Sequence, residues 1–193
     1  ATRVGSDEAA KAAGVNLFDL GDDRQGIVHI VSPEQGIALP GVTLVCPDSH
    51  TCTQGALGAL AWGIGSTECE HAMATKALAV QKPKFMRVRF EGPPGNGVTA
   101  KDMILFLIGR HTASGGVGYA IEFAGEAVRA LPMEARFTLC NMGVEFGAWT
   151  CIIAPDQTTY DYVEGRPYAP KGTVRDQALA YWKTLPTDDD AVF

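Results

Sequence analysis

The chain has 193 residues, of which 46% are hydrophobic, and its 16 Lys and Arg against 22 Asp and Glu give a net charge of −6. Neutralising phosphates requires clustered Lys and Arg, so this acidic chain with scattered basic residues is not expected to bind nucleic acid. No apolar run approaches the roughly 18 residues that a membrane span needs, and residues 1–14 lack a secretory signal pattern. We therefore expect a cytoplasmic protein, without a membrane partner.

The cysteines give no sign of a disulfide framework. They are odd in number and none lies in a C-x-x-C pair: Cys46, Cys52, Cys69, Cys140 and Cys151. We expect mostly buried thiols and no self-contained zinc or iron–sulfur site. Residues 9–13 are typical of the last turn of a helix that Gly14 ends, and the chain does not start with Met. These features indicate a fragment of a longer protein.

The first half of the chain predicts alternating strands and helices. Residues 26–31 are β-branched and suit either a buried strand or one turn of helix, and the pattern leaves both open. Residues 41–46 predict a buried strand, and polar residues follow at 48–50, where α/β sheets place their sites. Residues 67–70 match a capping box, which predicts a helix from about residue 68 to residue 80.

The second half continues this pattern. Residues 85–90 alternate as a half-exposed strand, and residues 119–123 predict another strand after a glycine-rich loop. Thr99 caps a predicted helix over residues 100–108, with Asp102 in its first turn and Gly109 as its stop. The alternation predicts an α/β fold.

Two further features concern the organisation of the chain. A composition break at residues 81–84 gives two units, 1–84 and 85–193. Apolar residues recur at helical spacing over residues 137–146, which places Asn141 and Glu145 on one helix face. The segment after Ala154 is polar and Pro-rich, and we interpret its end at residues 188–190 as a solvated connection.

The densest polar cluster, Asp48-Ser49-His50, does not define a reaction by its composition. Ser49 lacks the G-x-S-x-G surroundings of a hydrolase nucleophile, and for an isolated D-S-H a simple turn is the favoured interpretation. His29, His50 and His71 lack the i, i+4 pairing of a zinc helix. From the residues themselves, the sequence predicts a site near residues 48–50 and no specific chemistry.

Longer motifs supply a family. The strings PDSHT at 47–51, GIGSTE at 63–68 and CNMGVEFGA at 140–148 resemble the aconitase superfamily in order and separation. The tail, with APDQTTY at 154–160 and GRPYAPKG at 165–172, resembles the family of 3-isopropylmalate dehydratase large subunits. The resemblance implies layered α/β/α aconitase-type domains, here partial, with residues 1–84 in the first domain and residues 85–193 in the second.

The resemblance also implies an activity. Such enzymes are hydro-lyases that interconvert 2-isopropylmalate and 3-isopropylmalate in leucine biosynthesis by dehydration and rehydration. They use a 4Fe-4S cluster as Lewis acid and work with a small, swivel-domain subunit. The cluster cysteines of this family lie outside the matched segment, as do its base serine and its carboxylate-binding arginines.

Residue roles follow from the same resemblance. His29 matches a histidine that pairs with the aspartate at Asp48, and His50 matches one that pairs with the glutamate at Glu145. A carboxylate bound to one ring nitrogen fixes the tautomer and raises the basicity of the other. Ser49 is implied as a ligand of a substrate carboxylate.

The resemblance places Asn141 next to the cluster. Trp149 stands where leucine-pathway relatives usually have arginine, and Pro47 where they usually have glycine, so homoaconitase-type and citramalate-type dehydratases remain alternatives. A second hypothesis is a short non-catalytic paralogue that acts as a binding module. A third is a divalent-metal hydrolase using His29, Asp48 and His50. We further expect that Trp62 and Trp149 are exposed and that the isolated chain associates.

Overall fold

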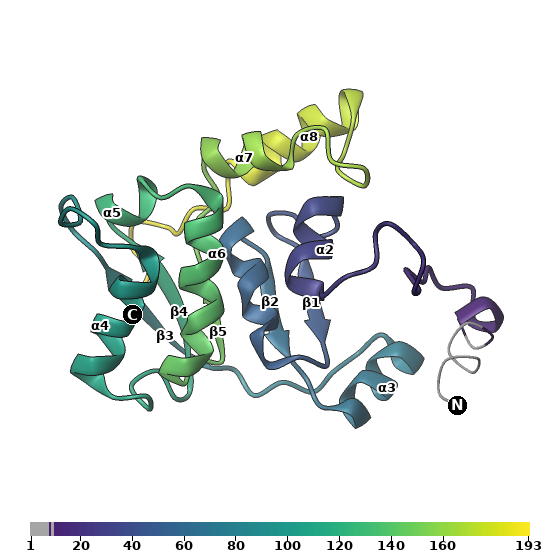
Figure 1. Cartoon of the computed structure of the whole chain (residues 1–193), viewed down its shortest axis with the longest axis horizontal. Coiled ribbons are helices and arrows are strands. Elements are labelled where there is room, and N and C mark those ends of the chain that lie inside the picture. The colour runs from purple at the N-terminus through teal and green to yellow at the C-terminus, as the bar shows by residue number, and fades with distance from the viewer. Residues whose placement is uncertain (1–7, 9) are drawn as a thin grey trace.

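A computed structural model describes residue 8 and residues 10–193 (Figure 1). The strands form two parallel sheets within that part of the chain. In the first, β1 (Thr43–Cys46) pairs with β2 (Leu60–Gly63). The second has the order β3 (Lys84–Arg89), β4 (Tyr119–Ala124) and β5 (Thr150–Ile152). Parallel neighbours need crossover connections, which carry the helices, so the α/β prediction is confirmed.

The helices surround and join the two sheets (Figure 1). The α-helices are α2 (Val28–Gln35), α3 (Ser66–Thr75), α4 (Ala100–His111), α5 (Glu126–Arg129), α6 (Met133–Asn141), α7 (Gln157–Val163) and α8 (Gly172–Trp182). Two 3₁₀ segments, η1 (Ser49–Leu57) and η2 (Met142–Phe146), follow β1 and α6. No helix in the described residues is both long and apolar enough to cross a membrane.

The N-terminal half resolves one open alternative and corrects two predictions. Residues 28–31 form the first turn of helix α2, so the helical alternative for residues 26–31 is correct. The strand at 43–46 is confirmed but not buried, because it belongs to a two-stranded sheet that leaves its side chains exposed or half-buried. Helix α3 begins after Gly65, whose N–H donates to the Glu68 carboxylate at 2.7 Å. It ends at Thr75 and not near residue 80 as predicted, because Lys76 adopts a left-handed φ of 57°.

The N-terminal helix prediction lies partly outside the described residues. Residues 10–13 are helical, and Gly14 has the positive φ of 65° that a helix-ending glycine commonly adopts. Ala9 and residues 1–7 are not described.

In the second half, the strands β3 and β4 confirm the predictions, and the Thr99 cap is present with Asp102. Helix α4, however, continues through Gly109 to His111. A glycine inside a helix costs only about 1 kcal/mol, which the packing of Leu107 and Ile108 against the core offsets. Residues 137–146 are not one helix, because α6 ends at Asn141 and η2 follows.

One hydrophobic core joins both sheets. Ile121 and Phe123 of the central strand β4 are buried together with Ile104 of α4 and Leu139 of α6. The boundary that we predict after residue 84 falls one residue into β3, and it stays a prediction.

The segment after Ala154 is more than a connection. Helices α7 and α8 lie along one side of the molecule (Figure 1) and place Tyr160, Val163 and Trp182 in the core. The end of the segment, with Asp188 to Asp190, is exposed as predicted. Trp62 and Trp149 are half-buried rather than fully exposed, because their rings pack together with centroids 4.8 Å apart.

Candidate active site

The turn after β1 presents the predicted polar cluster. Asp48 has an extended backbone and caps η1, with its Oδ1 accepting the His50 N–H at 2.8 Å. The Thr51 hydroxyl donates to the Asp48 carbonyl at 2.7 Å. The turn explanation and the functional explanation are therefore compatible, because the same carboxylate that shapes the turn also contacts a histidine.

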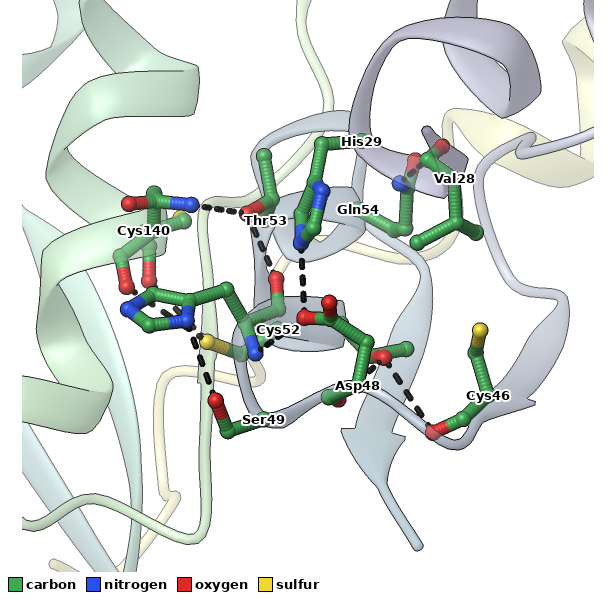
Figure 2. Close-up of polar contacts among 12 residues, drawn as sticks. Val28, His29, Cys46, Asp48, Ser49, Cys52, Thr53, Gln54 and Cys140 are labelled. Atoms are coloured by element: carbon green, nitrogen blue, oxygen red, sulfur yellow. Dashed lines mark hydrogen bonds and ion pairs between the residues drawn. The ribbon is translucent and has the colours of Figure 1, made fainter. Parts of the chain in front are cut away.

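That histidine is His29. Its Nε2 lies 3.0 Å from Asp48 Oδ1, and Figure 2 shows the ring of His29 directed at the Asp48 carboxylate. The His29 side chain is only 13% exposed. Gln54, completely buried in η1, donates from Nε2 to the Val28 carbonyl at 3.0 Å and so ties the start of α2 to η1. The contact fixes the helix that carries His29.

The second predicted pair is also in contact. His50 Nε2 lies 3.1 Å from Glu145 Oε1, and its Nδ1 lies 3.1 Å from Ser49 Oγ. Both ring nitrogens thus have a partner. A hydrolase triad has the serine on Nε2 and the acid on Nδ1, the reverse of this arrangement. The contact gives no support to a serine hydrolase.

Asn141 reaches the same segment from α6. Its Nδ2 donates to the Thr53 hydroxyl at 2.8 Å, and that hydroxyl donates to the His50 carbonyl at 2.6 Å (Figure 2). Asn141 and Glu145 therefore both contact η1, although they lie on two short helices. The sequence periodicity predicted that both side chains lie on one face of a single helix. In the structure α6 ends at Asn141 and η2 carries Glu145.

The two imidazoles line one pocket of about 710 Å³, and their ring centroids are 6.3 Å apart. Asn141 and Thr53 line it as well. Its apolar wall consists of Ile27, Ile30, Pro33, Phe137 and Met142.

Sequence reasoning missed several polar residues here, namely Thr53, Gln54, Lys101 and Tyr162. Burial raises the pKa of the Tyr162 phenol. No motif marked these residues.

The cysteines of this chain do not suit a metal cluster. Burial raises the pKa of Cys52 to about 11 and those of Cys140 and Cys151 well above their usual range, which disfavours the thiolate that a cluster needs. All five cysteines are free, and three are buried, as predicted. Among the described residues, no group of three or more His, Cys, Asp or Glu is arranged to hold a metal ion. The arrangement therefore does not support the metal-hydrolase hypothesis.

Comparison with known proteins places this sequence in a family. The sequence matches the aconitase family (aconitate hydratase) over residues 5–193. The chain belongs to the aconitase family. It is 56% identical over 182 residues to the 3-isopropylmalate dehydratase large subunit 1 of Bradyrhizobium diazoefficiens, and 57% identical over 180 residues to the 3-isopropylmalate dehydratase large subunit of Roseiflexus castenholzii.

These matches cover 94% and 93% of this aconitase-family chain and 38% of each relative. The chain thus spans well under half of their length.

Proposed function

We propose that this chain is part of a hydro-lyase that interconverts 2-isopropylmalate and 3-isopropylmalate by dehydration and rehydration in leucine biosynthesis. The observation that carries the proposal is the pair of histidine–carboxylate contacts, His29 with Asp48 and His50 with Glu145, whose imidazoles line one pocket. Membership of the aconitase family and relatives named as 3-isopropylmalate dehydratase large subunits support it.

Moving a hydroxyl between neighbouring carbons requires two proton transfers. In dehydration the C–O bond breaks and the leaving oxygen takes a proton, while the adjacent carbon loses a proton to a base; rehydration reverses both. With Nε2 held by Asp48, His29 Nδ1 has no hydrogen-bond partner among the described residues and can give or accept a proton. A protonated His50 donates from Nδ1 to the Ser49 oxygen and from Nε2 to Glu145, and it can release the Nε2 proton to the Glu145 carboxylate. Ser49 is proposed to donate to a substrate carboxylate.

A 4Fe-4S cluster belongs to this proposal, with its cysteine ligands outside these residues, and it would supply a Lewis acid at the departing hydroxyl. We place Asn141 next to it, on the same wall of the pocket as His50. We also propose a small subunit as partner, a cytoplasmic location and a division into domains between residues 84 and 85.

The pocket wall favours an isopropylmalate over substrates with a further carboxylate. Ile27, Ile30, Phe137 and Met142 offer an apolar surface next to the histidines, which suits a branched alkyl group. Homoaconitase-type substrates would place a charged group there. Because both histidine–carboxylate contacts are kept, the structure offers no observation that favours a non-catalytic binding module.

The test uses the complete large subunit with its small subunit, assayed for conversion of 2-isopropylmalate. Substituting His29→Gln or His50→Gln is expected to lower kcat by about a hundredfold or more, the usual loss for a proton-transfer residue. His71→Gln is the control, because His71 is exposed on α3 and lies outside the pocket. Turnover of a homocitrate-type or citramalate-type acid in place of 2-isopropylmalate would establish the alternative substrate. Full activity of both variants would refute the catalytic assignment.

A further inference from the structure

The pocket that the two histidines line also contains a positively charged side chain that the proposed function does not use. Lys101, in the first turn of α4, lines it together with His29, His50 and Asn141. It is the single Lys or Arg among the lining residues. Within the described part of the chain, the Lys101 ammonium has no hydrogen bond or ion pair, and the residue is exposed.

Helix stability does not account for this lysine. The first turn of a helix favours acidic side chains, because the N-terminal end carries partial positive charge. Asp102 fills that role, with its Oδ2 accepting the Thr99 N–H at 2.8 Å and the Thr99 hydroxyl at 2.6 Å. The Asp102 carboxylate is thereby committed to the cap, and Lys101 stands beside it at the unfavourable end of the helix dipole.

The packing of α4 fixes the place of this cation relative to the histidines. Helix α4 packs against α6, which ends at Asn141, and against η2, which carries Glu145. The backbone of Lys101 is thus held by the same elements that build the site, while its side chain remains free to adapt to a ligand.

We propose that Lys101 binds the second carboxylate of a dicarboxylate substrate, the one remote from the reacting hydroxyl. This inference rests on the proposed function. Two acidic residues, Glu34 and Glu134, line the same pocket and repel a carboxylate from their own positions. Lys101 is therefore the side chain in this pocket that attracts the second carboxylate. The apolar side chains of Phe137 and Met142 line the same pocket as the two histidines. A charge-assisted hydrogen bond to an ammonium suits a carboxylate of this kind.

The experiment compares Lys101→Met and Lys101→Arg in the complete large subunit with its small subunit. Loss of a hydrogen bond between charged groups is expected to raise KM for 2-isopropylmalate about tenfold to a hundredfold, with kcat changed far less. Lys101→Arg keeps the charge and is expected to recover most of the affinity. Lys183→Met, which removes an exposed lysine at the end of α8, is the control and should match the wild type.

A binding measurement separates this inference from the proposed function. Calorimetry compares 2-isopropylmalate with 2-hydroxy-2,3-dimethylbutanoate, in which a methyl group replaces the carboxymethyl arm. Lys101→Met should weaken the dicarboxylate and leave the monocarboxylate unchanged. Equal weakening of both ligands, or no weakening of either, overturns the role of Lys101. If the wild type fails to convert 2-isopropylmalate, the proposed function fails, and the same comparison with malate and 2-hydroxypropanoate still decides the role of Lys101.

Discussion

A single buried charge controls how the last helices attach to the site. Arg136 of α6 is completely buried, and its Nη1 and Nη2 each lie 2.8 Å from an oxygen of Asp156. Its remaining donors reach the Leu131 and Arg129 carbonyls at 3.1 Å and 2.8 Å. Desolvating a guanidinium is costly, and these four hydrogen bonds, two of them to a carboxylate, compensate. The same helix ends at Asn141, so the pair also supports the pocket.

Asp156→Asn is expected to destabilise the chain by about 3 kcal/mol, because it leaves the Arg136 charge buried without its counter-charge. Asparagine is also a good N-cap residue, so the start of α7, which Asp156 caps, should be preserved. Urea unfolding measures the loss. Asp161→Asn is the control, since Asp161 only accepts an exposed bond from Gln157, and its midpoint should stay near the wild type. Equal midpoints for the two variants would contradict the argument.

The two histidine–carboxylate pairs were predicted from family motifs and not from residue spacing. His29 and Asp48 are 19 positions apart and His50 and Glu145 are 95 apart, and periodicity does not link residues across such separations. The family motifs paired them, and both contacts are present. Lys101 and Gln54 were missed because their surroundings are created by packing between α2, α4, α6 and η1, which no local pattern encodes.

At the scale of elements, substitutions at two glycines distinguish the effect of packing on stability from the effect of helix propensity. A Cβ at Gly55 in η1 would overlap the carbonyl oxygen of Cys151 in β5, whereas one at Gly109 in α4 would meet no heavy atom within 4 Å. Gly55→Ala should therefore push η1 away from β5 at a cost of about 1–3 kcal/mol. Gly109→Ala should stabilise the chain by about 0.4–1 kcal/mol. Urea midpoints measure both, and the prediction is wrong if the two shifts have the same sign.

The ends of elements were less predictable than their existence. Sequence placed a stop at Gly109 because glycine commonly follows a helix, but the residues after it continue α4 to a C-terminus that carries Arg110 and His111. The predicted end of α3 near residue 80 was also wrong, because Lys76 turns the chain into a left-handed conformation without a glycine. Tertiary packing decides such ends. The Thr99 cap depends on local bonds and was predicted correctly, whereas the capping box predicted at residues 67–70 was wrong, because α3 begins after Gly65, whose N–H donates to Glu68.

The Thr99 cap also predicts a pH dependence. The Thr99 hydroxyl, and then its N–H, hold the pKa of Asp102 below its ordinary value. A carboxyl with a lowered folded-state pKa adds stability above its unfolded pKa of about 3.9, and this stability is lost as the pH falls through the folded value. Asp102→Asn should therefore lower the urea midpoint at pH 6 and converge with the wild type in strong acid. Thr99→Val also removes the bond that the Thr99 hydroxyl accepts from the Asp102 N–H, which does not depend on pH, so only part of its deficit should disappear in strong acid. A midpoint difference between Asp102→Asn and the wild type that persists at the lowest pH would contradict the assignment.

At the scale of the whole molecule, the described residues leave apolar side chains uncovered. On and next to α4, Val98 is 44% exposed, Leu105 45% and Phe106 64%. The chain spans 38% of its relatives' length, so we expect that such surfaces drive self-association when the chain is studied alone. Light scattering after size exclusion should give a mass that rises with concentration.

Phe106→Lys should lower that mass, because a charge replaces the most exposed of the three side chains. Val174→Lys, at a 59% exposed position on α8, is the control, and an equal drop in mass would show that added charge, not the α4 surface, controls association. A constant monomer mass for the wild type at its highest soluble concentration would refute the expectation.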